Sequence, residues 1–457
     1  MQYSKLAINT PEGLMFGNAL YPVTTRRGLI IGGGSVIPEL NFTLPTISIN
    51  AETFPAVREH YRSIVADAIE HARGLHSNGV IFEFETLLEM TQTPAYGVEL
   101  VKIMNDICED NYQKYGFKSE IRLTPNDLRE FDRPPLCRTS KYLEAMWELF
   151  DKGSQAGGDL LSIESTGGKE IHDEALMMCD IKAVIFALSV LGVRDMKMLW
   201  SNIVNIAHKN GRHAGGDTAC GFGNTAMVLA EKGFIPKIFA ALVRVISAVR
   251  TLVAIEEGAV GPDKDCGYEG PFLKAITGTP ISMEGKMSAC AHFSPLGNIA
   301  ACCADLWSNE SVQNIKLLSG MAPTVYLEQL EYDARLMNQA LKAGTSTASM
   351  LQNLFSDSDR KLDPQAIILA PDNVIAIAGE IVKGENYIDA SLKAANKGLE
   401  IIDDAFRSGQ LLVPEIEVPW IDMLREALSE VPTDESNFVE EMLPLLEGKF
   451  IPSEYGL

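Results

Sequence analysis

The sequence lacks the features of membrane-spanning and exported proteins. It has no uninterrupted apolar run of the roughly 18–20 residues that cross a bilayer. Its longest apolar region, residues 235–255, contains Lys237, Arg244 and Arg250. Residues 1–13 hold no basic segment followed by an apolar one, so no signal peptide is expected. These absences predict a cytoplasmic protein without a membrane span.

Positive charge is also scarce. The chain has 39 Lys and Arg against 61 Asp and Glu, which gives a net charge of −22. Nucleic acid is therefore not an expected partner, because binding to phosphates needs clustered Lys and Arg. The same charge argues against binding to an anionic membrane surface.

Cysteine is too rare for a disulfide scaffold, with 8 in 457 residues. In a cytoplasmic protein these thiols stay reduced and can bind metal. The sequence also contains no phosphate-binding loop of the form G-x-x-x-x-G-K-[S/T] and no clear dinucleotide fingerprint at its start. Nucleotide chemistry is therefore not expected.

What the sequence does contain is an alternation of short apolar runs with amphipathic helical patterns. Over roughly 250–300 residues this alternation favours a parallel sheet. Without a clear linker, we expect a closed (β/α)8 barrel of the TIM type. The patterns predict strands at residues 79–85, 119–123, 159–163, 196–200 and 314–318, and helices at 95–115 and 172–191.

Three regions are expected along the chain. Residues 1–55 are predicted to form an irregular lead-in packed on the barrel, and residues 56–320 the barrel itself. Residues 321–457 are predicted to form a helical C-terminal extension packed on the barrel. The helices expected there are 324–341, 364–382 and 386–408, with 356–364 as a polar connector.

Two cysteines stand in glycine-rich, polar segments rather than in apolar ones. Cys220 lies in residues 213–225 (HAGGDTACGFGNT), and Cys266 lies in residues 261–270 (GPDKDCGYEG). Structural cysteines are usually buried in apolar stretches, as we expect for Cys290, Cys302 and Cys303. Loop thiols instead suggest a metal site, although a packing role for Cys220 and Cys266 stays open.

Glu164 is the best carboxylate to complete such a site, because it stands where a predicted strand meets a loop. Active sites of (β/α)8 barrels form at the C-terminal ends of the strands. Two thiolates and one carboxylate suit Zn²⁺ and leave a fourth position for an exchangeable ligand. His213 is an alternative ligand, with a hydrogen-bonding role more in keeping with its setting.

The segments around these residues resemble a known family. Residues 213–225, 263–270 and 161–165 (LSIES), together with 287–294 (MSACAHFS) and their continuation through Cys302 and Cys303, are similar to the methanol:corrinoid methyltransferases. These are the zinc-containing components of the methanol-specific system of methanogens and some acetogens. The resemblance covers most of the chain and implies a (β/α)8 barrel with one zinc per chain, held by Glu164, Cys220 and Cys266.

The resemblance also implies the reaction and its partners. The methyl group of methanol would pass to cobalt(I) of a corrinoid carried by a separate protein, in a hetero-oligomer that contains a homodimer. Zn²⁺ would act as a Lewis acid on the methanol oxygen. Three anionic ligands would leave the site with a charge near −1, which blunts that acidity. A neighbouring donor could offset the charge, and Asp180, Asp217 and His213 are candidates only by their closeness in sequence.

Two other functions remain open. The chain could be a zinc methyltransferase for another small methyl donor. The uroporphyrinogen-decarboxylase-like methyltransferases use a His-x-Cys motif, which is absent here. The chain could also be a non-catalytic subunit that docks a corrinoid protein and holds a structural zinc, in which case four protein ligands would saturate the metal.

Overall fold

The core of the computed structural model is a curled parallel sheet, and the model describes residues 1–43, 47–286, 295–312 and 321–457. Seven strands lie in the order β7–β6–β5–β4–β3–β9–β8, and every neighbouring pair is parallel. They are β3 (Ile37–Thr43), β4 (Val80–Glu85), β5 (Ser119–Thr124), β6 (Gly158–Ile163), β7 (His213–Asp217), β8 (Ser282–Glu284) and β9 (Leu306–Val312). The expected α/β fold is thus confirmed, with seven strands within the described residues where a closed barrel has eight.

Residues 260–264 connect the two edges of this sheet. On one side, the backbone N–H groups of Val260, Gly261 and Lys264 donate to β7 carbonyls at 2.8, 2.9 and 3.2 Å. On the other side, the N–H of Ser282 in β8 donates to Asp263 Oδ1 at 3.0 Å. The segment therefore lies between the edge strands β7 and β8.

The inside of the sheet changes from apolar to polar along the strands. Near the strand starts, a small apolar cluster combines sheet residues such as Ile81 and Leu160 with Val23 and Ile31 of the antiparallel pair β1 (Asn18–Thr24) and β2 (Ile30–Gly33). Further toward the C-terminal ends of the strands, Arg122 Nε contacts Glu39 Oε1 at 2.6 Å. The β1–β2 pair thus closes the N-terminal end of the sheet, and polar groups face the C-terminal end.

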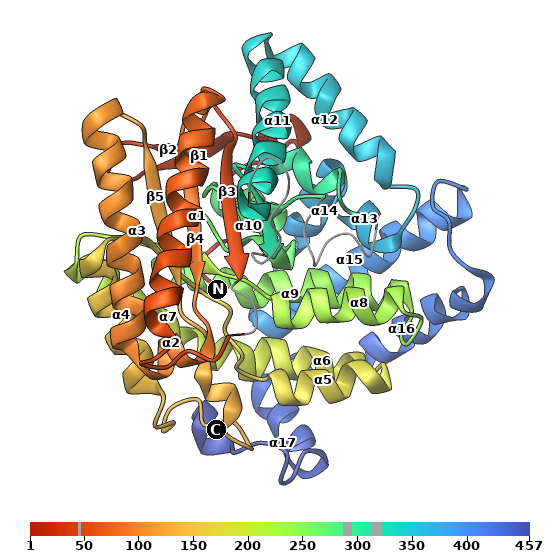
Figure 1. The fold of residues 1–457 in the computed structure, drawn as a ribbon. Coiled ribbons are helices and arrows are strands. Elements are labelled where there is room, and N and C mark those ends of the chain that lie inside the picture. Colours follow the sequence, from red (N-terminus) through yellow and green to blue (C-terminus); the bar gives the residue numbers. More distant parts are fainter. Residues whose placement is uncertain (44–46, 287–294, 313–320) are drawn as a thin grey trace.

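Helices surround the sheet (Figure 1). Those of the first part pack in sequence, with α1 against α3 and α3 against α4. They are α1 (Phe54–Gly74), α2 (Leu88–Gln92), α3 (Pro94–Tyr115), α4 (Leu143–Ala156), α5 (Lys169–Met178), α6 (Ile181–Phe186), α7 (Val193–Lys209), α8 (Thr225–Glu231), α9 (Lys237–Glu256) and α10 (Gly270–Thr277).

The C-terminal helices pack back onto this body, chiefly through α15 on α9. They are α11 (Ala322–Lys342), α12 (Thr345–Asp359), α13 (Pro364–Ile368), α14 (Pro371–Ile381), α15 (Tyr387–Arg407), α16 (Pro419–Ser429) and α17 (Glu435–Leu445). The predicted helices at 324–341 and 386–408 are confirmed. The one predicted at 364–382 is two helices, because Pro371 cannot continue α13 and begins α14 instead.

Helix α9 is the one described helix long and apolar enough to cross a membrane. The whole of its apolar window is buried inside the protein, as in a core helix. Two arginines of this helix, Arg244 and Arg250, are fully buried and donate to Gly267 O at 2.7 Å and Ser165 O at 2.8 Å. Their positive charges therefore hold loops of the protein in place.

Several local predictions were wrong. Residues 196–200 are part of helix α7, whose buried Met196, Leu199, Trp200 and Ile203 recur at helical spacing. The predicted helix 172–191 is interrupted where Cys179 adopts a left-handed backbone (φ 52°) and Asp180 caps α6. The predicted strand at 314–318 and the family-like segment 287–294, with Cys290, lie outside the described residues.

The N-terminal region also differs from the expected irregular lead-in. β3 pairs with β4 on one side and β9 on the other, so residues 37–43 form an interior strand of the sheet. The pattern was missed because Glu39 and Asn41, both buried, point polar groups where strands usually carry apolar ones. The division of the chain into three regions, with boundaries after residues 55 and 320, stays a prediction.

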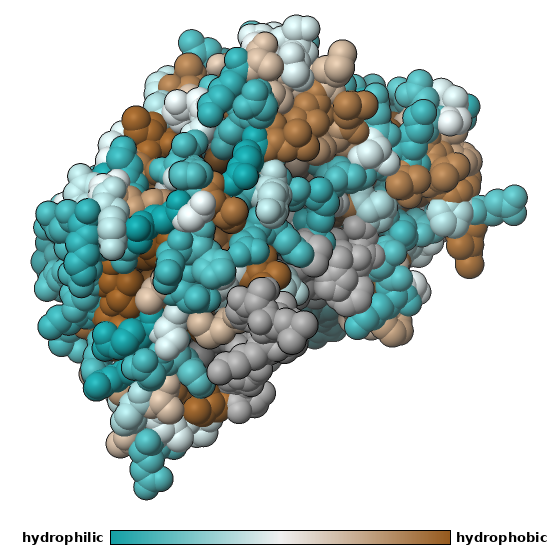
Figure 2. Space-filling view, turned by 45° about the horizontal axis from the view of Figure 1, so that its top comes forward, coloured by the Kyte–Doolittle hydropathy of each residue, from teal (hydrophilic) through white to brown (hydrophobic). Residues whose placement is uncertain are grey.

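Polar side chains cover most of the face seen in Figure 2, and hydrophobic areas are scattered among them. This surface fits the net charge of −22. The large apolar side chains exposed on α11 and α12 are Tyr332, Leu336, Met350 and Leu354.

Candidate metal centre

The three predicted ligands lie close together, in the segments after strands β6 and β7 and in a nearby turn. Glu164 directly follows β6, Cys220 follows β7 after two residues, and Cys266 lies in a 3-10 turn, Asp265–Gly267, next to residues 260–264. One ligand atom from each lies within 4.8 Å of the other two. Cys266 Sγ is 3.2 Å from Glu164 Oε1. Residues far apart in sequence meet here because parallel strands present their C-terminal ends at one edge.

Each cysteine is followed by a glycine, for different reasons. A Cβ at Gly267 would lie 2.0 Å from Glu269 Oε2 and 2.5 Å from Thr218 Oγ1, so a larger residue cannot fit. A Cβ at Gly221 would meet only the flexible end of Lys169, with Cε at 3.2 Å. Gly267 is therefore required for the tight packing of the two cysteine turns, whereas Gly221 leaves room beside Cys220.

The three side chains differ in exposure. Cys266 is buried, whereas Glu164 and Cys220 are half-buried. Burial raises the pKa of the Cys266 thiol well above its ordinary value, against the opposing effect of its hydrogen bond with Cys220. Without a metal, the Cys266 S–H donates to Glu164 Oε1. A cation bound here would replace that proton, since metals bind the thiolate form.

A cleft of about 140 Å³ opens beside Glu164. It is lined by Glu85, Thr124, Pro125, Asn126, Asp127, Glu130, Glu164, Ser165, Thr166, Lys169 and Gly221. The larger cavity of about 730 Å³ is lined by residues 2–7, 21–23 and parts of 255–279, and includes none of the three predicted ligands. Of these two spaces, only the small cleft is lined by a predicted ligand, Glu164.

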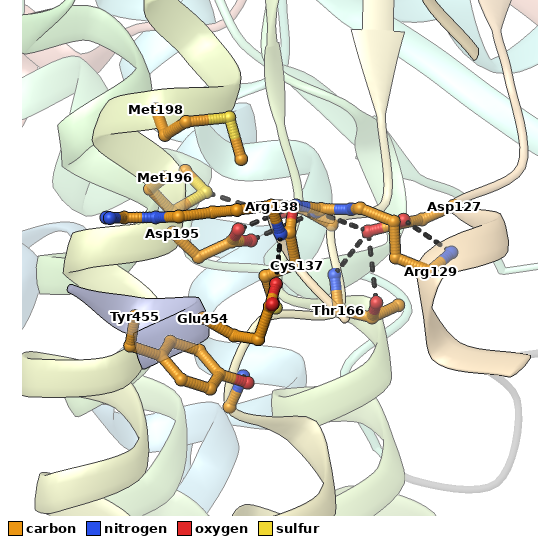
Figure 3. A network of polar contacts seen from close by, with 12 residues as sticks. Asp127, Arg129, Cys137, Arg138, Thr166, Asp195, Met196, Met198, Glu454 and Tyr455 are labelled. Carbon is orange, nitrogen blue, oxygen red and sulfur yellow. Dashed lines mark hydrogen bonds and ion pairs between the residues drawn. The ribbon is translucent and has the colours of Figure 1, made fainter. Parts of the chain in front are cut away.

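A polar network fixes the loop that follows Glu164 (Figure 3). The Thr166 N–H and hydroxyl each donate to Asp127 Oδ2 at 3.0 Å. Arg129 bridges Asp127 Oδ2 at 2.7 Å and Asp195 Oδ1 at 2.6 Å. Burial alone would raise the pKa of Asp127, but Arg129 holds it below its ordinary value. The loop is thus attached to α7 and to the loop after β5.

Of the three residues named as neighbouring donors, only Asp217 lies near the site. Asp217 Oδ1 accepts from the Ser165 N–H at 3.3 Å, and its Oδ2 accepts from Trp200 Nε1 at 2.7 Å. His213 Nε2 instead lies 2.9 Å from Thr24 O, at the start of β7. Asp180 caps α6 by accepting from the Ala183 N–H. Asp217 therefore supports the loop, and the other two act elsewhere.

Sequence reasoning missed Lys264. Its Nζ is 2.9 Å from Glu164 Oε1 and 3.9 Å from Cys266 Sγ, and the side chain is 2% exposed. Burial alone would lower the pKa of Lys264, but its neighbours Cys266 and Glu164 raise it well above its ordinary value. In the sequence, Lys264 stands between two aspartates and two residues before Cys266. That position next to a candidate ligand could have pointed to it.

Known proteins resemble this chain over its whole length. The model of the methanol-cobalamin methyltransferase B subunit family matches residues 1–456. A "methanol--corrinoid protein co-methyltransferase" of Methanosarcina barkeri is 37% identical in an alignment of length 463. The alignment covers 100% of this chain and 99% of the relative.

A solved structure shares the fold. It is the crystal structure of the methanol:cobalamin methyltransferase complex MtaBC from Methanosarcina barkeri, which matches with a TM-score of 0.94 and 36% identity over 100% of this chain and 99% of that one. Fold, full-length identity and family model agree with the resemblance found in the loops around Glu164, Cys220 and Cys266. The chain therefore belongs to the methanol-cobalamin methyltransferase B subunit family.

Proposed function

We propose that this chain transfers the methyl group of methanol to the cobalt of a corrinoid protein, with zinc held by Glu164, Cys220 and Cys266. The observation that carries the proposal is the convergence of these three side chains within 4.8 Å beside a small cleft. Family membership supports the reaction, and the relative from Methanosarcina barkeri bears that activity in its name.

The donor set fits zinc by its chemistry. Two thiols and a carboxylate are ligands that Zn²⁺ prefers, and three protein ligands are typical of a catalytic rather than a structural site. The hydrogen bond from Cys266 to Glu164 is a contact that a cation would replace. When bound, zinc supplies Lewis acidity toward the methanol oxygen.

The chain's own residues hold the substrate and the loop. The cleft of about 140 Å³ has room for a molecule as small as methanol, and Thr124, Asn126 and Glu85 give it polar walls. The network of Asp127, Arg129 and Thr166 keeps the Glu164 loop in place, so that the reacting groups are positioned before they meet. In the reaction the methanol C–O bond breaks, a cobalt–carbon bond forms, and the departing hydroxide takes up a proton.

The corrinoid is proposed to arrive on a second protein that docks over the loops carrying the three ligands. The solved complex named MtaBC supports a partner of this kind. We also propose that residues 260–264 take the place of the eighth strand of a closed barrel, which puts Glu164, Cys220 and Cys266 on three consecutive strand ends. A homodimer within the complex remains part of the proposal.

The test is an anaerobic assay with reduced cobalamin, with and without methanol, followed by visible absorption. We expect methylcobalamin to appear only with methanol and only in the zinc-loaded protein. X-ray absorption at the zinc edge should show two sulfurs and an oxygen set that changes when methanol is added.

The two alternatives give other results. Four fixed protein ligands would indicate a structural zinc in a docking subunit. Turnover with another small methyl donor and none with methanol would identify the other kind of zinc methyltransferase.

A further inference from the structure

Lys264 is buried at the centre of an acidic group of side chains. It belongs to the segment between β7 and β8, where its backbone N–H donates to Asp217 O at 3.2 Å. Its Nζ lies 2.9 Å from Glu164 Oε1, 3.4 Å from Asp265 Oδ1 and 3.5 Å from Glu83 Oε1. Glu85 Oε2 is 3.6 Å away. One ammonium therefore faces four carboxylates.

The shortest of these contacts is to the candidate ligand. A buried ammonium is stable only where charges and hydrogen bonds replace its lost hydration, and Glu164 provides the closest such partner. The same Glu164 oxygen accepts the hydrogen bond from Cys266 Sγ, so Lys264 and Cys266 meet at one atom. Carboxylates that bind metals are themselves commonly held by hydrogen bonds of this kind.

We propose that Lys264 is a positioning residue that holds the Glu164 carboxylate against Cys266 and offsets the negative charge of the three donors. This inference rests on the proposed metal site. Two thiolates and a carboxylate carry three negative charges, and a divalent cation leaves the group at −1. The ammonium of Lys264 adds one positive charge next to the donors and offsets this −1. Glu83, Glu85 and Asp265 also contact the ammonium, so without Lys264 the surroundings of the site would be strongly negative and would weaken a Lewis acid there.

Another buried lysine shows what a purely structural role looks like. Lys274 is fully buried and contacts Asp305 Oδ1 at 2.9 Å, and it also donates to the carbonyls of Cys303 and Met15 at 2.8 and 3.1 Å. These contacts hold backbone segments together. Lys264 Nζ instead contacts side chains that belong to the candidate site or border it.

The test is a double-mutant cycle with metal affinity as its readout. The four proteins are the wild type, Lys264→Met, Glu164→Gln and the double variant, and the zinc Kd is measured by competition with a chromogenic chelator. We expect Lys264→Met to weaken zinc binding by about 10–100-fold, the range found when a group supporting a ligand is removed. In the Glu164→Gln background the same change should have a smaller effect, because the contact with Glu164 is already lost and only the charge of Lys264 near Cys266 remains.

A spectroscopic readout accompanies the cycle. With cobalt(II) in place of zinc, Lys264→Met should shift the visible bands toward those of Glu164→Gln, because both variants perturb the same oxygen ligand. Lys264→Arg, which keeps the charge, should recover part of the affinity. Lys274→Met is the matched control, and its folded fraction should bind zinc as the wild type does.

The inference is overturned if Lys264→Met binds zinc with wild-type affinity and spectrum, or if its effect is the same size with and without Glu164. If Lys264→Met does not fold, the cycle is run with Lys264→Gln in a Glu83→Gln background, which restores the net charge of the interior. A wild-type protein that binds no zinc would contradict the proposed metal site itself, and is thereby distinguished from a failure of the Lys264 inference.

Discussion

At the scale of single residues, the cysteines of this chain lie in two kinds of surroundings. Cys108, Cys302 and Cys303 are buried in the core, where burial raises the pKa of each thiol. Cys220 and Cys266 instead end up beside a carboxylate in turns that follow the sheet. The proposed metal site therefore uses two of the cysteines, and the core thiols are packed as small hydrophobic groups.

The first prediction concerns these two thiols. Cys220→Ala or Cys266→Ala should each lose most of the zinc, which we expect at about one per chain in the wild type, because thiolates hold Zn²⁺ tightly. Metal analysis of the purified proteins measures this. Cys179→Ala changes a thiol elsewhere that is half-buried like Cys220, and this variant should keep its zinc. Full zinc content in both site variants would show that the ligands are misassigned.

The second prediction concerns Glu331 in α11, far from the site in the sequence. Burial raises the pKa of Glu331 to about 7 from 4.5. Between these two pH values the folded protein keeps a proton that the unfolded chain has lost, so the free energy of unfolding falls as pH rises. The slope should be about 1.4 kcal/mol per pH unit from this group.

Denaturant unfolding from pH 4.5 to 8 measures this slope. Glu331→Gln should remove that share of the pH dependence and be more stable than the wild type at pH 8. Glu447→Gln, at an exposed position, is the control. An unchanged pH profile in Glu331→Gln would contradict the prediction.

At the scale of elements, the last residues of the chain support the start of α5, which follows the Glu164 loop. Tyr455 is fully buried, and its hydroxyl accepts from the Gly168 N–H at 3.0 Å and donates to Glu170 Oε1 at 3.0 Å. Gly168 has a left-handed backbone (φ 84°) at this helix start. Glu454 also accepts from the Arg138 N–H at 2.6 Å, so the C-terminal turn joins two loops (Figure 3).

The third prediction follows from this contact. Tyr455→Phe should lower the free energy of unfolding by about 1–3 kcal/mol, because it leaves the buried Gly168 N–H without its acceptor. Thermal and denaturant unfolding measure the loss. Tyr332→Phe, at an exposed position of α11, should change stability little. Equal stability of the two variants would show that the C-terminal turn does not support α5.

At the scale of the whole molecule, net charge and the position of the cleft bear on partner binding. A charge of −22 favours association with a complementary surface and makes its rate depend on salt. The cleft and the three candidate ligands lie together at the C-terminal edge of the sheet. The proposed partner that delivers a corrinoid would therefore dock at this edge.

The fourth prediction tests that surface. Anaerobic purification should recover a corrinoid-bearing protein with this chain, and Gly221→Leu should weaken the complex, because Gly221 lines the cleft. Gly379→Leu, in α14 with open space around its Cβ, is the control. Gly267 is unsuitable for this test, because any side chain there collides with Glu269. A wild-type chain that itself contains stoichiometric corrinoid would contradict the prediction.

The sequence by itself determined the chemistry of the candidate site and the class of the fold. Glycine-rich polar segments marked Cys220 and Cys266 as loop thiols, and the end of an apolar run marked Glu164, because such patterns are local. Local patterns also misled. Met196 to Trp200 reads as a short apolar run, yet its residues belong to one face of α7. The polar strand β3 and the glycine-containing β7 were missed because their neighbours in the sheet, rather than their own periodicity, make them strands.

Only the tertiary structure decided which residues meet. The order of the strands brings Glu164, Cys220 and Cys266 together, and no local pattern contains that order. It also places Lys264 against Glu164 and Tyr455 against Gly168, pairs separated by 100 and 287 residues. Such contacts depend on how distant segments pack, and a buried lysine looks in the sequence like an ordinary surface residue. The physical reason is that a side chain pairs with the charges and hydrogen-bonding groups that lie near it in space. That proximity arises only when the chain folds.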